Sequence, residues 1–388
     1  MKRILIFILV VAMILPATLG LSSCDKNNGE DSGDVIVLNV YNWGEYMPLS
    51  EDEDGYDLNA EFEAWYYETY GQKIRVNYDM FSSNEELRAK LEANAVSYDI
   101  IIPSDYMVDY FVNNDMLLPI NFDNIPNYKN IGDDFKNLYY DPENKYSVPY
   151  TYSTIGIIYN SAVVDPADVE SMGWEVMWSE KYREAGILQF NNSRDAFGMA
   201  MYNLGISVNT TDKSDWDRAY NKLVEQQSVI YGRVMDEIYN FMEVGETAIG
   251  AYYAGDYFTM LDNQVDGVEL RCYTPDNTNV FVDAMCIPKT CRNKQAAEAY
   301  INFILGVEAG TALANYLYYG TPNTAVRENL GYLADLTPEE KAEVMDVIYP
   351  SNFDFKESFN KNAYRDLNTL SPEIHAYMTE LWEKLIIQ

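Results

Sequence analysis

Apolar residues along positions 35–114 recur at two spacings, one typical of strands and one typical of helices. Strands are predicted at 35–40, 73–78 and 98–103, and helices at 58–70, 84–95 and 106–114. Gly71 follows the first of these helices, as is common at a helix C-terminus. Ser83 and Glu86 fit a capping box at the start of the second helix. The β-α-β-α-β order predicts an α/β fold built on a parallel sheet.

Two of the predicted strands end in segments that combine aromatic, polar and carboxylate side chains. One is the sequence YNWGEY at 41–46, and the other is PSDYM at 103–107. In parallel α/β sheets, ligands bind outside the carboxyl ends of the strands. The two segments are therefore expected to face one crevice and to form part of a binding site.

The chain beyond residue 150 predicts a second α/β lobe. Residues 153–281 contain helices rich in tryptophan and tyrosine, and they are followed by the strand-like run FVDAMCIPK at 281–289. No internal repeat is visible. With 388 residues, of which 48% are hydrophobic, the chain is long enough for about two domains.

The first 34 residues predict a lipoprotein leader and a tether. Two basic residues precede an apolar run at 4–15, which is short for a membrane-spanning helix, and LSSC at 21–24 resembles a bacterial lipobox. The resemblance implies that residues 1–23 are removed and that Cys24 carries a diacylglycerol on its thiol and an acyl chain such as palmitate on its amine. The polar residues 24–34 would then tether the folded body to the extracytoplasmic face of the cell membrane.

The formal net charge is −34, from 61 acidic and 27 basic residues. Binding to nucleic acid needs lysine and arginine to replace counterions, so this charge argues against a nucleic-acid partner. A strongly negative field concentrates cations around the protein, and it also keeps the protein soluble.

The sequence offers little for catalysis or for a metal. His375 is the only histidine, and the dinucleotide, P-loop and H-E-x-x-H motifs are absent. Residues 50–61 match an EF-hand loop in part, but a serine stands at the first ligand position, so no metal and no cofactor is predicted. Cys272, Cys286 and Cys291 lack a nearby histidine for zinc, and a disulfide between the last two stays open.

Four segments carry a resemblance to a known family. They are YNWGEY, YDIIIPSDYMVDYF, YSVPYTYSTIGIIYN and INFILG…GTPN, in this order along the chain. In these segments the chain resembles the polyamine-binding proteins of bacterial spermidine/putrescine ABC importers. The resemblance implies a two-lobed periplasmic-binding-protein fold of type II, with a mainly parallel sheet and flanking helices in each lobe and the ligand in the cleft between them. The lobes are expected at 35–150 plus 284–325 and at 151–283 plus 326–388.

The resemblance also assigns the ligand-binding residues. They are Trp43, Glu45, Tyr46, Ser104, Tyr106, Asp195, Tyr253, Asp256, Phe281, Asp283 and Tyr319. Asp283 corresponds to the central carboxylate of the family, and Asp256 to an acid of putrescine-preferring members. Asn192 stands where the family commonly has a further acid, and Tyr253 replaces a tryptophan. A late glutamine of the family has no clear counterpart.

The chemistry of these residue types suits a polyamine. Ammonium groups leave water only where carboxylates and hydrogen bonds replace it, and aromatic rings cover methylene groups while attracting the positive charge. The missing acid at Asn192 favours putrescine, with spermidine left open.

The predicted function is that of a monomeric, non-enzymatic receptor that delivers putrescine or spermidine to a membrane permease driven by a separate ATPase. The alternatives are a binding protein for another cationic solute or for ferric iron, a surface glycosidase with two carboxylates, and an adhesin. Iron would give visible colour and a glycosidase would show turnover. An adhesin would expose an apolar patch without an enclosed cleft.

Overall fold

The computed structural model divides the chain into residues 1–34 and residues 35–388. The residues that it describes are 35–49, 56–93, 96–329, 331, 333–334, 336–350 and 353–387. The predicted leader, Cys24, the tether and the first half of the EF-hand-like loop therefore lie outside the described residues. In the described ranges, no helix has the length and apolar character needed to cross a membrane.

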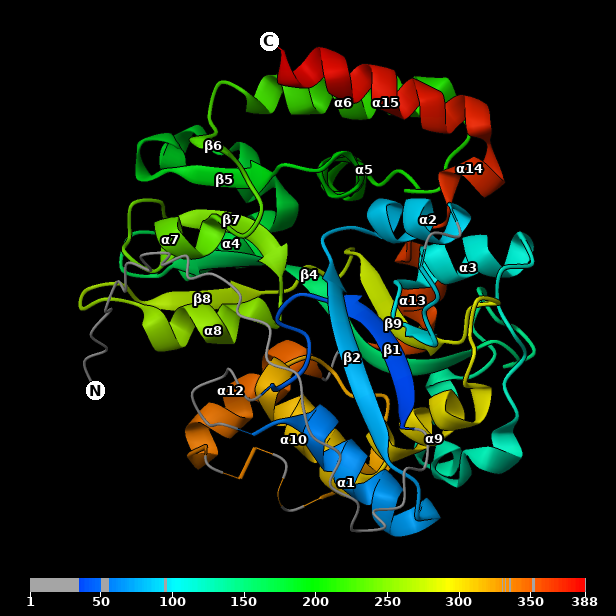
Figure 1. Ribbon diagram of the computed structural model, residues 1–388. Coiled ribbons are helices and arrows are strands. Elements are labelled where there is room, and N and C mark those ends of the chain that lie inside the picture. Colours follow the sequence, from blue (N-terminus) through cyan, green and yellow to red (C-terminus); the bar gives the residue numbers. More distant parts are fainter. Residues whose placement is uncertain are drawn as a thin grey trace, which may run out of the picture. The chain divides into compact units, whose positions relative to one another are not determined.

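The strands form one continuous sheet whose two halves meet at β4 (Figure 1). Within the described residues the strands are β1 (Ile36–Trp43), β2 (Ile74–Phe81), β3 (Ile100–Ile101), β4 (Ser147–Asn160), β5 (Ile187–Phe190), β6 (Gly232–Val234), β7 (Ile249–Tyr253), β8 (Leu270–Tyr273) and β9 (Val280–Cys286). Their order is β2-β1-β3-β9-β4-β7-β5-β6, and β8 also pairs with β4. β1 continues to Trp43, so half of the YNWGEY segment belongs to the strand and not to the loop after it.

Helices flank both halves of the sheet. They are α1 (Leu58–Tyr70), α2 (Asn84–Glu92), α3 (Asp105–Asn113), α4 (Pro166–Met172), α5 (Ser193–Leu204), α6 (Lys213–Gln226), α7 (Ile238–Met242), α8 (Asp256–Asn263), α9 (Lys294–Ile304), α10 (Val307–Leu317), α11 (Thr324–Arg327), α12 (Pro338–Ile348), α13 (Phe355–Asn362), α14 (Leu367–Leu370) and α15 (Pro372–Ile386). The predicted end of α1 is confirmed, since Gly71 is left-handed at φ 68°. The predicted capping box of α2 is only half formed. Ser83 accepts a hydrogen bond from the Glu86 amide, but the Glu86 carboxylate accepts from Ser82.

β4 belongs to both halves of the sheet. Its residues 147–154 pair with β9, and its residues 155–160 pair with β7 and β8. Every residue of this strand is buried, as expected for a central strand covered on both faces.

The α/β fold class is confirmed, but the sheet is mixed and not mainly parallel. β1 runs parallel to β2 and β3, and β5 runs parallel to β6 and β7. In contrast, β4 and β9 run antiparallel to each of their neighbours. Parallel neighbours require a crossover connection, usually a helix. Because β4 passes directly from one half into the other and β9 returns along it, this central pair is antiparallel.

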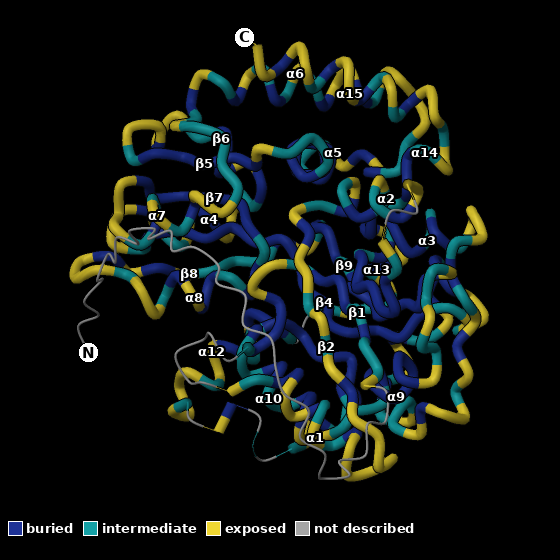
Figure 2. The backbone as a smooth tube through the Cα atoms, in the orientation of Figure 1, coloured by how far each residue is buried: buried dark blue, intermediate teal, exposed yellow. Residues whose placement is uncertain are grey.

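Each half of the sheet has its own hydrophobic core. Buried residues are found in the strands and helices of both halves (Figure 2). The first core takes side chains from β1, β3, β9, α1, α3, α9 and α10. The second core takes side chains from β5, β7, α5, α6, α12 and α15. Near the C-terminus the chain changes core between neighbouring residues, since Ala363 belongs to the first core and Tyr364 to the second. The lobe boundaries given above stay a prediction.

The cysteines at 272, 286 and 291 are free thiols. Cys286 is fully buried on β9, where it packs as a small apolar side chain of the first core. The disulfide that the sequence left open between Cys286 and Cys291 is not formed.

Candidate functional site

Asp283 lies on β9 at the centre of the sheet, buried at 3% exposure. The Tyr46 hydroxyl donates to its Oδ2 atom at 2.6 Å and also lies 2.8 Å from the Thr151 hydroxyl of β4. Burial raises the pKa of Asp283 to about 6, while hydrogen bonds from Tyr46 and Ser104 act in the opposite direction. The buried Oδ1 atom accepts no hydrogen bond of normal geometry within the described residues, so it is available to a donor from a ligand.

The loop after β3 is fixed to this carboxylate. Ser104 forms an isolated antiparallel bridge with Asp283, and its hydroxyl does not cap α3. Next to it, the buried Asp105 carboxylate accepts from the amides of Tyr106 (2.6 Å) and Val282 (3.2 Å). Burial raises the pKa of Asp105 to about 8. These bonds tie the second predicted binding segment to β9.

Asp195 lies in the first turn of α5, where Asn192 caps the helix. The Asn192 side chain accepts from the Asp195 amide at 2.8 Å and donates to the Asp195 Oδ2 atom at 2.7 Å. Tyr253 donates to the same oxygen at 3.1 Å. Burial raises the pKa of Asp195, opposed by hydrogen bonds from Asn192, Tyr364 and Tyr253. The position where the family commonly has an acid therefore supplies a cap and a hydrogen-bond donor here.

Asp256 begins α8. The Tyr319 hydroxyl lies 3.3 and 3.2 Å from its two carboxylate oxygens. Burial raises the pKa of Asp256 to about 7, and hydrogen bonds from Tyr239 and Tyr319 oppose this rise. The preceding residue has to be a glycine, because a Cβ atom on Gly255 would lie 2.1 Å from the Tyr319 ring.

Aromatic rings connect the three carboxylates. The Tyr319 ring is edge-on to Tyr46, with centroids 5.6 Å apart, and lies 6.2 Å from Phe281. Phe281 in turn lies 5.6 Å from Tyr253. We call this group the aromatic–carboxylate cluster; its members are Tyr46, Asp195, Tyr253, Asp256, Phe281, Asp283 and Tyr319. Its chemistry suits a ligand that has positive charges separated by apolar groups.

The cluster lies where the two cores meet. Tyr253 packs against both hydrophobic cores, as does Tyr106 at the start of α3. Tyr46 and Phe281 pack with the first core, and the helix that carries Asp195 belongs to the second. A ligand in the cluster would therefore contact both halves of the molecule.

Three predicted site residues form hydrogen bonds or ring contacts with described residues outside the cluster. The Trp43 ring packs on Phe81, with centroids 4.5 Å apart. Glu45 is exposed in a left-handed conformation (φ 51°) and accepts from a tyrosine on α10 at 3.3 Å. The Tyr106 hydroxyl accepts from Asn84 at 2.9 Å and donates to Glu85 at 3.4 Å. These three residues lie next to the loops of the cluster and do not share its hydrogen bonds.

Several supporting residues were not predicted from the sequence. Thr151, Asn192 and Tyr239 each bond a member of the cluster. Tyr364 was also missed, and its hydroxyl packs directly on Gly198 of α5, where a Cβ atom would lie only 2.2 Å away. A glycine inside a helical pattern is a signal of such close packing.

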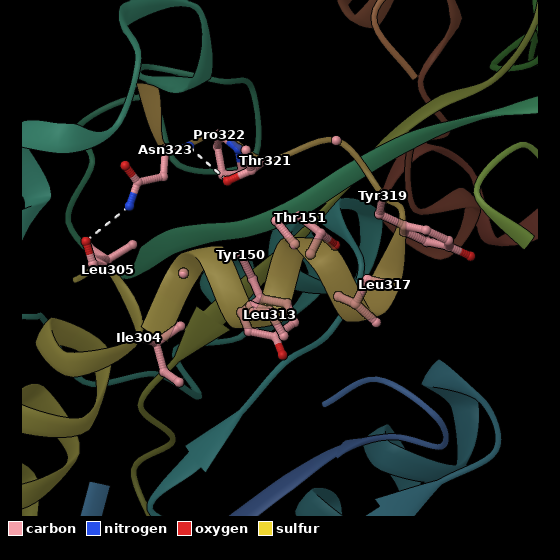
Figure 3. A pocket seen from close by; sticks show the side chains of 13 residues that line it. Tyr150, Thr151, Ile304, Leu305, Leu313, Leu317, Tyr319, Thr321, Pro322 and Asn323 are labelled. Atoms are coloured by element: carbon pink, nitrogen blue, oxygen red, sulfur yellow. Dashed lines mark hydrogen bonds between the residues drawn. The ribbon is translucent and has the colours of Figure 1, made fainter. Parts of the chain in front are cut away.

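A hollow of about 10 Å³ lies behind Tyr319, between α10 and β4 (Figure 3). Its lining includes Tyr150, Thr151, Leu317 and Tyr319. At this volume it holds at most one water molecule, so it is too small to accommodate part of a ligand.

Comparison with known proteins gives consistent matches over most of the chain. The family of bacterial extracellular solute-binding proteins matches residues 58–341. The spermidine/putrescine-binding periplasmic protein of Escherichia coli is 31% identical over 324 residues, which cover 83% of this chain and 85% of that protein. The putrescine-binding periplasmic protein PotF of the same organism is 25% identical, with 90% and 91% covered.

Solved structures show the same fold. The spermidine/putrescine ABC transporter substrate-binding protein PotD from Streptococcus pneumoniae matches with a TM-score of 0.72 and 30% identity, over 91% of this chain and 99% of that chain. The Tp0655 lipoprotein of Treponema pallidum matches with a TM-score of 0.68 and 22% identity, over 90% and 99%. The predicted periplasmic-binding-protein fold is thus confirmed, and the chain belongs to the family of bacterial extracellular solute-binding proteins.

Proposed function

We propose that this protein is an extracytoplasmic receptor that binds a linear polyamine and delivers it to an ABC permease driven by a separate ATPase. The observation that carries the proposal is the aromatic–carboxylate cluster. In it three carboxylates, of which Asp195 and Asp283 are buried and Asp256 is half-buried, each bond a tyrosine hydroxyl and are joined by aromatic rings. The relatives named as spermidine- or putrescine-binding proteins support the same ligand class.

The cluster would hold a polyamine by its ends. The open Oδ1 atom of Asp283 would accept one ammonium group, and Asp195 or Asp256 would accept another. Phe281 and the tyrosine rings would cover the methylene groups between them, each cation–π contact contributing on the order of 0.5–2 kcal/mol. Micromolar affinity requires about 8 kcal/mol, which two paired ammonium groups and an aromatic slot can supply.

Putrescine is the ligand that we favour. Asp195 already shares one oxygen between Asn192 and Tyr253, so it has less capacity for a further ammonium group than a pair of acids would have. The Asn192→Asp variant tests this point, because a second carboxylate beside Asp195 should raise the affinity for spermidine relative to putrescine. An unchanged ratio of the two affinities would remove Asn192 from the selectivity argument.

The tyrosines of the cluster are poorly suited to ferric iron. Burial raises the pKa values of Tyr46, Tyr253 and Tyr319 well above the ordinary range, because it disfavours the phenolate. Iron sites built on tyrosine need that phenolate. The described residues also contain no group of three or more histidine, cysteine and carboxylate side chains that could hold a metal ion.

The two cores would correspond to two lobes that close on the ligand, at residues 35–150 plus 284–325 and 151–283 plus 326–388. In this arrangement α13 packs on the first lobe, as its buried Phe359 does on the first core. Residues 1–23 would be removed, and a lipid on Cys24 would hold the protein at the outer face of the cell membrane. Mass spectrometry of the purified protein tests this, since Cys24→Ser should abolish the lipid mass.

Isothermal titration with putrescine and spermidine tests the ligand. We expect one binding site of micromolar affinity or tighter, and at least a hundredfold weaker binding for Asp283→Asn, because an uncharged amide cannot pair with ammonium. Asp123→Asn serves as the matched control, since this aspartate is exposed and distant from the cluster in its contacts. Heats that never saturate and equal those of salt-matched potassium chloride would contradict the proposal.

A further inference from the structure

A second cavity, of about 410 Å³, lies outside the aromatic–carboxylate cluster. Its lining residues come from α2 and α3 on one side and from the start of α5 and residues 365–379 on the other. Its charged lining residues are Glu85, Arg88, Glu92, Arg194, Arg365 and Asp366. No member of the cluster lines it. Tyr106, which the resemblance assigns to the ligand, does line it, so this cavity adjoins the predicted ligand site and has a different set of charged residues.

The carboxylates of this cavity are largely used by the protein itself. Glu92 accepts from Arg88 at 2.8 Å and from Tyr110 at 2.6 Å. Asp366 caps α14 and accepts from the Thr369 amide and hydroxyl at 2.8 and 2.6 Å. Glu85 keeps only the long contact from Tyr106 among the described residues.

Arg365, in contrast, holds a guanidinium group with free hydrogen-bond donors. Its backbone is fixed, because its amide donates to Asn209 at 2.8 Å and its carbonyl accepts from Arg194 at 2.9 Å. Its guanidinium lies over the Tyr139 ring, 3.1 Å from the centroid. Within the described ranges this group donates no hydrogen bond and lies within ion-pair distance of no carboxylate. Stacking on a ring leaves the N–H donors in the guanidinium plane open to an acceptor.

The carboxylates near Arg365 compensate its charge only in part. Burial lowers the pKa of Arg365, and the nearby Tyr139, Asp109 and Asp105 only partly oppose this. Arg194, from the same wall, donates to the Asn209 side chain and to backbone carbonyls, so it too has no carboxylate partner among the described residues. A half-buried guanidinium is costly unless an acceptor replaces water.

We propose that this cavity binds an oxyanion, a carboxylate or a phosphate, with Arg365 as its anchor. A guanidinium offers a planar pair of donors that matches the two oxygens of either group. The site would be an anion-binding feature on a protein of net charge −34. Tyr106, one of the predicted ligand-binding residues, lines this cavity too, but Arg365 is not a member of the cluster, so anion binding and polyamine binding can be measured separately.

The test is a titration of the mature protein with inorganic phosphate and with succinate, each at constant ionic strength against chloride. We expect a saturable rise in melting temperature and a dissociation constant of millimolar or tighter, and the tighter of the two probes identifies the preferred group. Arg365→Gln should weaken binding at least tenfold. Arg218→Gln is the matched control, since this arginine is 56% exposed and pairs with Asp215, and it should leave binding unchanged.

Two further measurements keep the test decisive. Circular dichroism and the putrescine titration show whether Arg365→Gln folds; if it does not, Arg88→Gln tests the same cavity from the opposite wall. Glu85→Gln should strengthen anion binding, because it removes a negative charge from the lining.

A melting temperature that follows salt alone in all variants would overturn the proposal. So would a strongly non-additive loss of stability in the Glu85→Gln and Arg365→Gln double variant, which would mean that the two side chains pair with each other in solution.

Discussion

Tyr46, Tyr253 and Tyr319 each donate a hydrogen bond to a different carboxylate of the cluster. A hydrogen bond to a charged group contributes about 1.5–3 kcal/mol, so Tyr46→Phe should weaken polyamine binding roughly tenfold or more. Titration calorimetry at neutral pH measures this loss. Tyr67→Phe is the control, because Tyr67 is 52% exposed on α1. Equal affinities of the two variants would show that the hydroxyl does not support the site.

The raised pKa values of the same carboxylates predict a pH dependence. Burial raises the pKa of Asp256 to about 7 and that of Asp283 to about 6, above about 4 in an unfolded chain. Between these values the folded protein holds more protons than the unfolded one, so the stability of the free protein should fall as pH rises from 4 to 7. Asp105, whose pKa burial raises to about 8, extends this fall to about pH 8.

Polyamine binding should have the opposite pH dependence. Ammonium groups favour the ionised carboxylates, so binding below pH 7 must release protons. We expect the affinity to rise between pH 5.5 and 8 by up to about tenfold per pH unit for each proton released. Calorimetry in buffers of different ionisation enthalpy would detect the released protons directly. An affinity that is flat over this range would contradict the assignment of buried, partly protonated carboxylates.

At the scale of the helix, α5 carries Asp195, and its Gly198 packs against the Tyr364 side chain. Gly198→Ala would put a Cβ atom 2.2 Å from the Tyr364 hydroxyl, and the ring would have to move. Overpacking of this kind costs about 1–3 kcal/mol. Gly232→Ala is the matched control, since a Cβ atom there meets no atom within 4 Å. Denaturant unfolding should show a lower stability for the α5 variant alone; equal stabilities would mean that Tyr364 has room to move.

Elements that depend on local sequence could be predicted, and those that depend on distant partners could not. The end of α1 at Gly71 follows from a left-handed glycine, a local feature. The antiparallel run of β9 between β3 and β4 depends on pairing with residues more than a hundred positions away. In the site, the resemblance to the polyamine-binding family identified Asp195, Asp256 and Asp283. The support from Tyr364 depends on a C-terminal segment that packs on α5 only in the folded chain.

At the scale of the whole molecule, the ligand should stabilise both halves together, because the cluster lies where the two cores meet. A ligand at a hundredfold excess over its dissociation constant adds about 2.7 kcal/mol to the stability of the folded state. The melting temperature should therefore rise with the logarithm of putrescine concentration and not with potassium chloride at equal ionic strength. Asp283→Asn should lose this rise. If only part of the transition shifted, the two halves would unfold independently.

The place of β9 in the sheet also determines when the first core can form during synthesis of the chain. β9 lies between β3 and β4, so the first core lacks its central strand until residues 280–286 have been made, and it lacks Phe359 until later still. Contacts between such distant segments form slowly, because a long loop must close first. The first core is therefore completed only after most of the chain has been made, and until then its apolar strands lack their central partner.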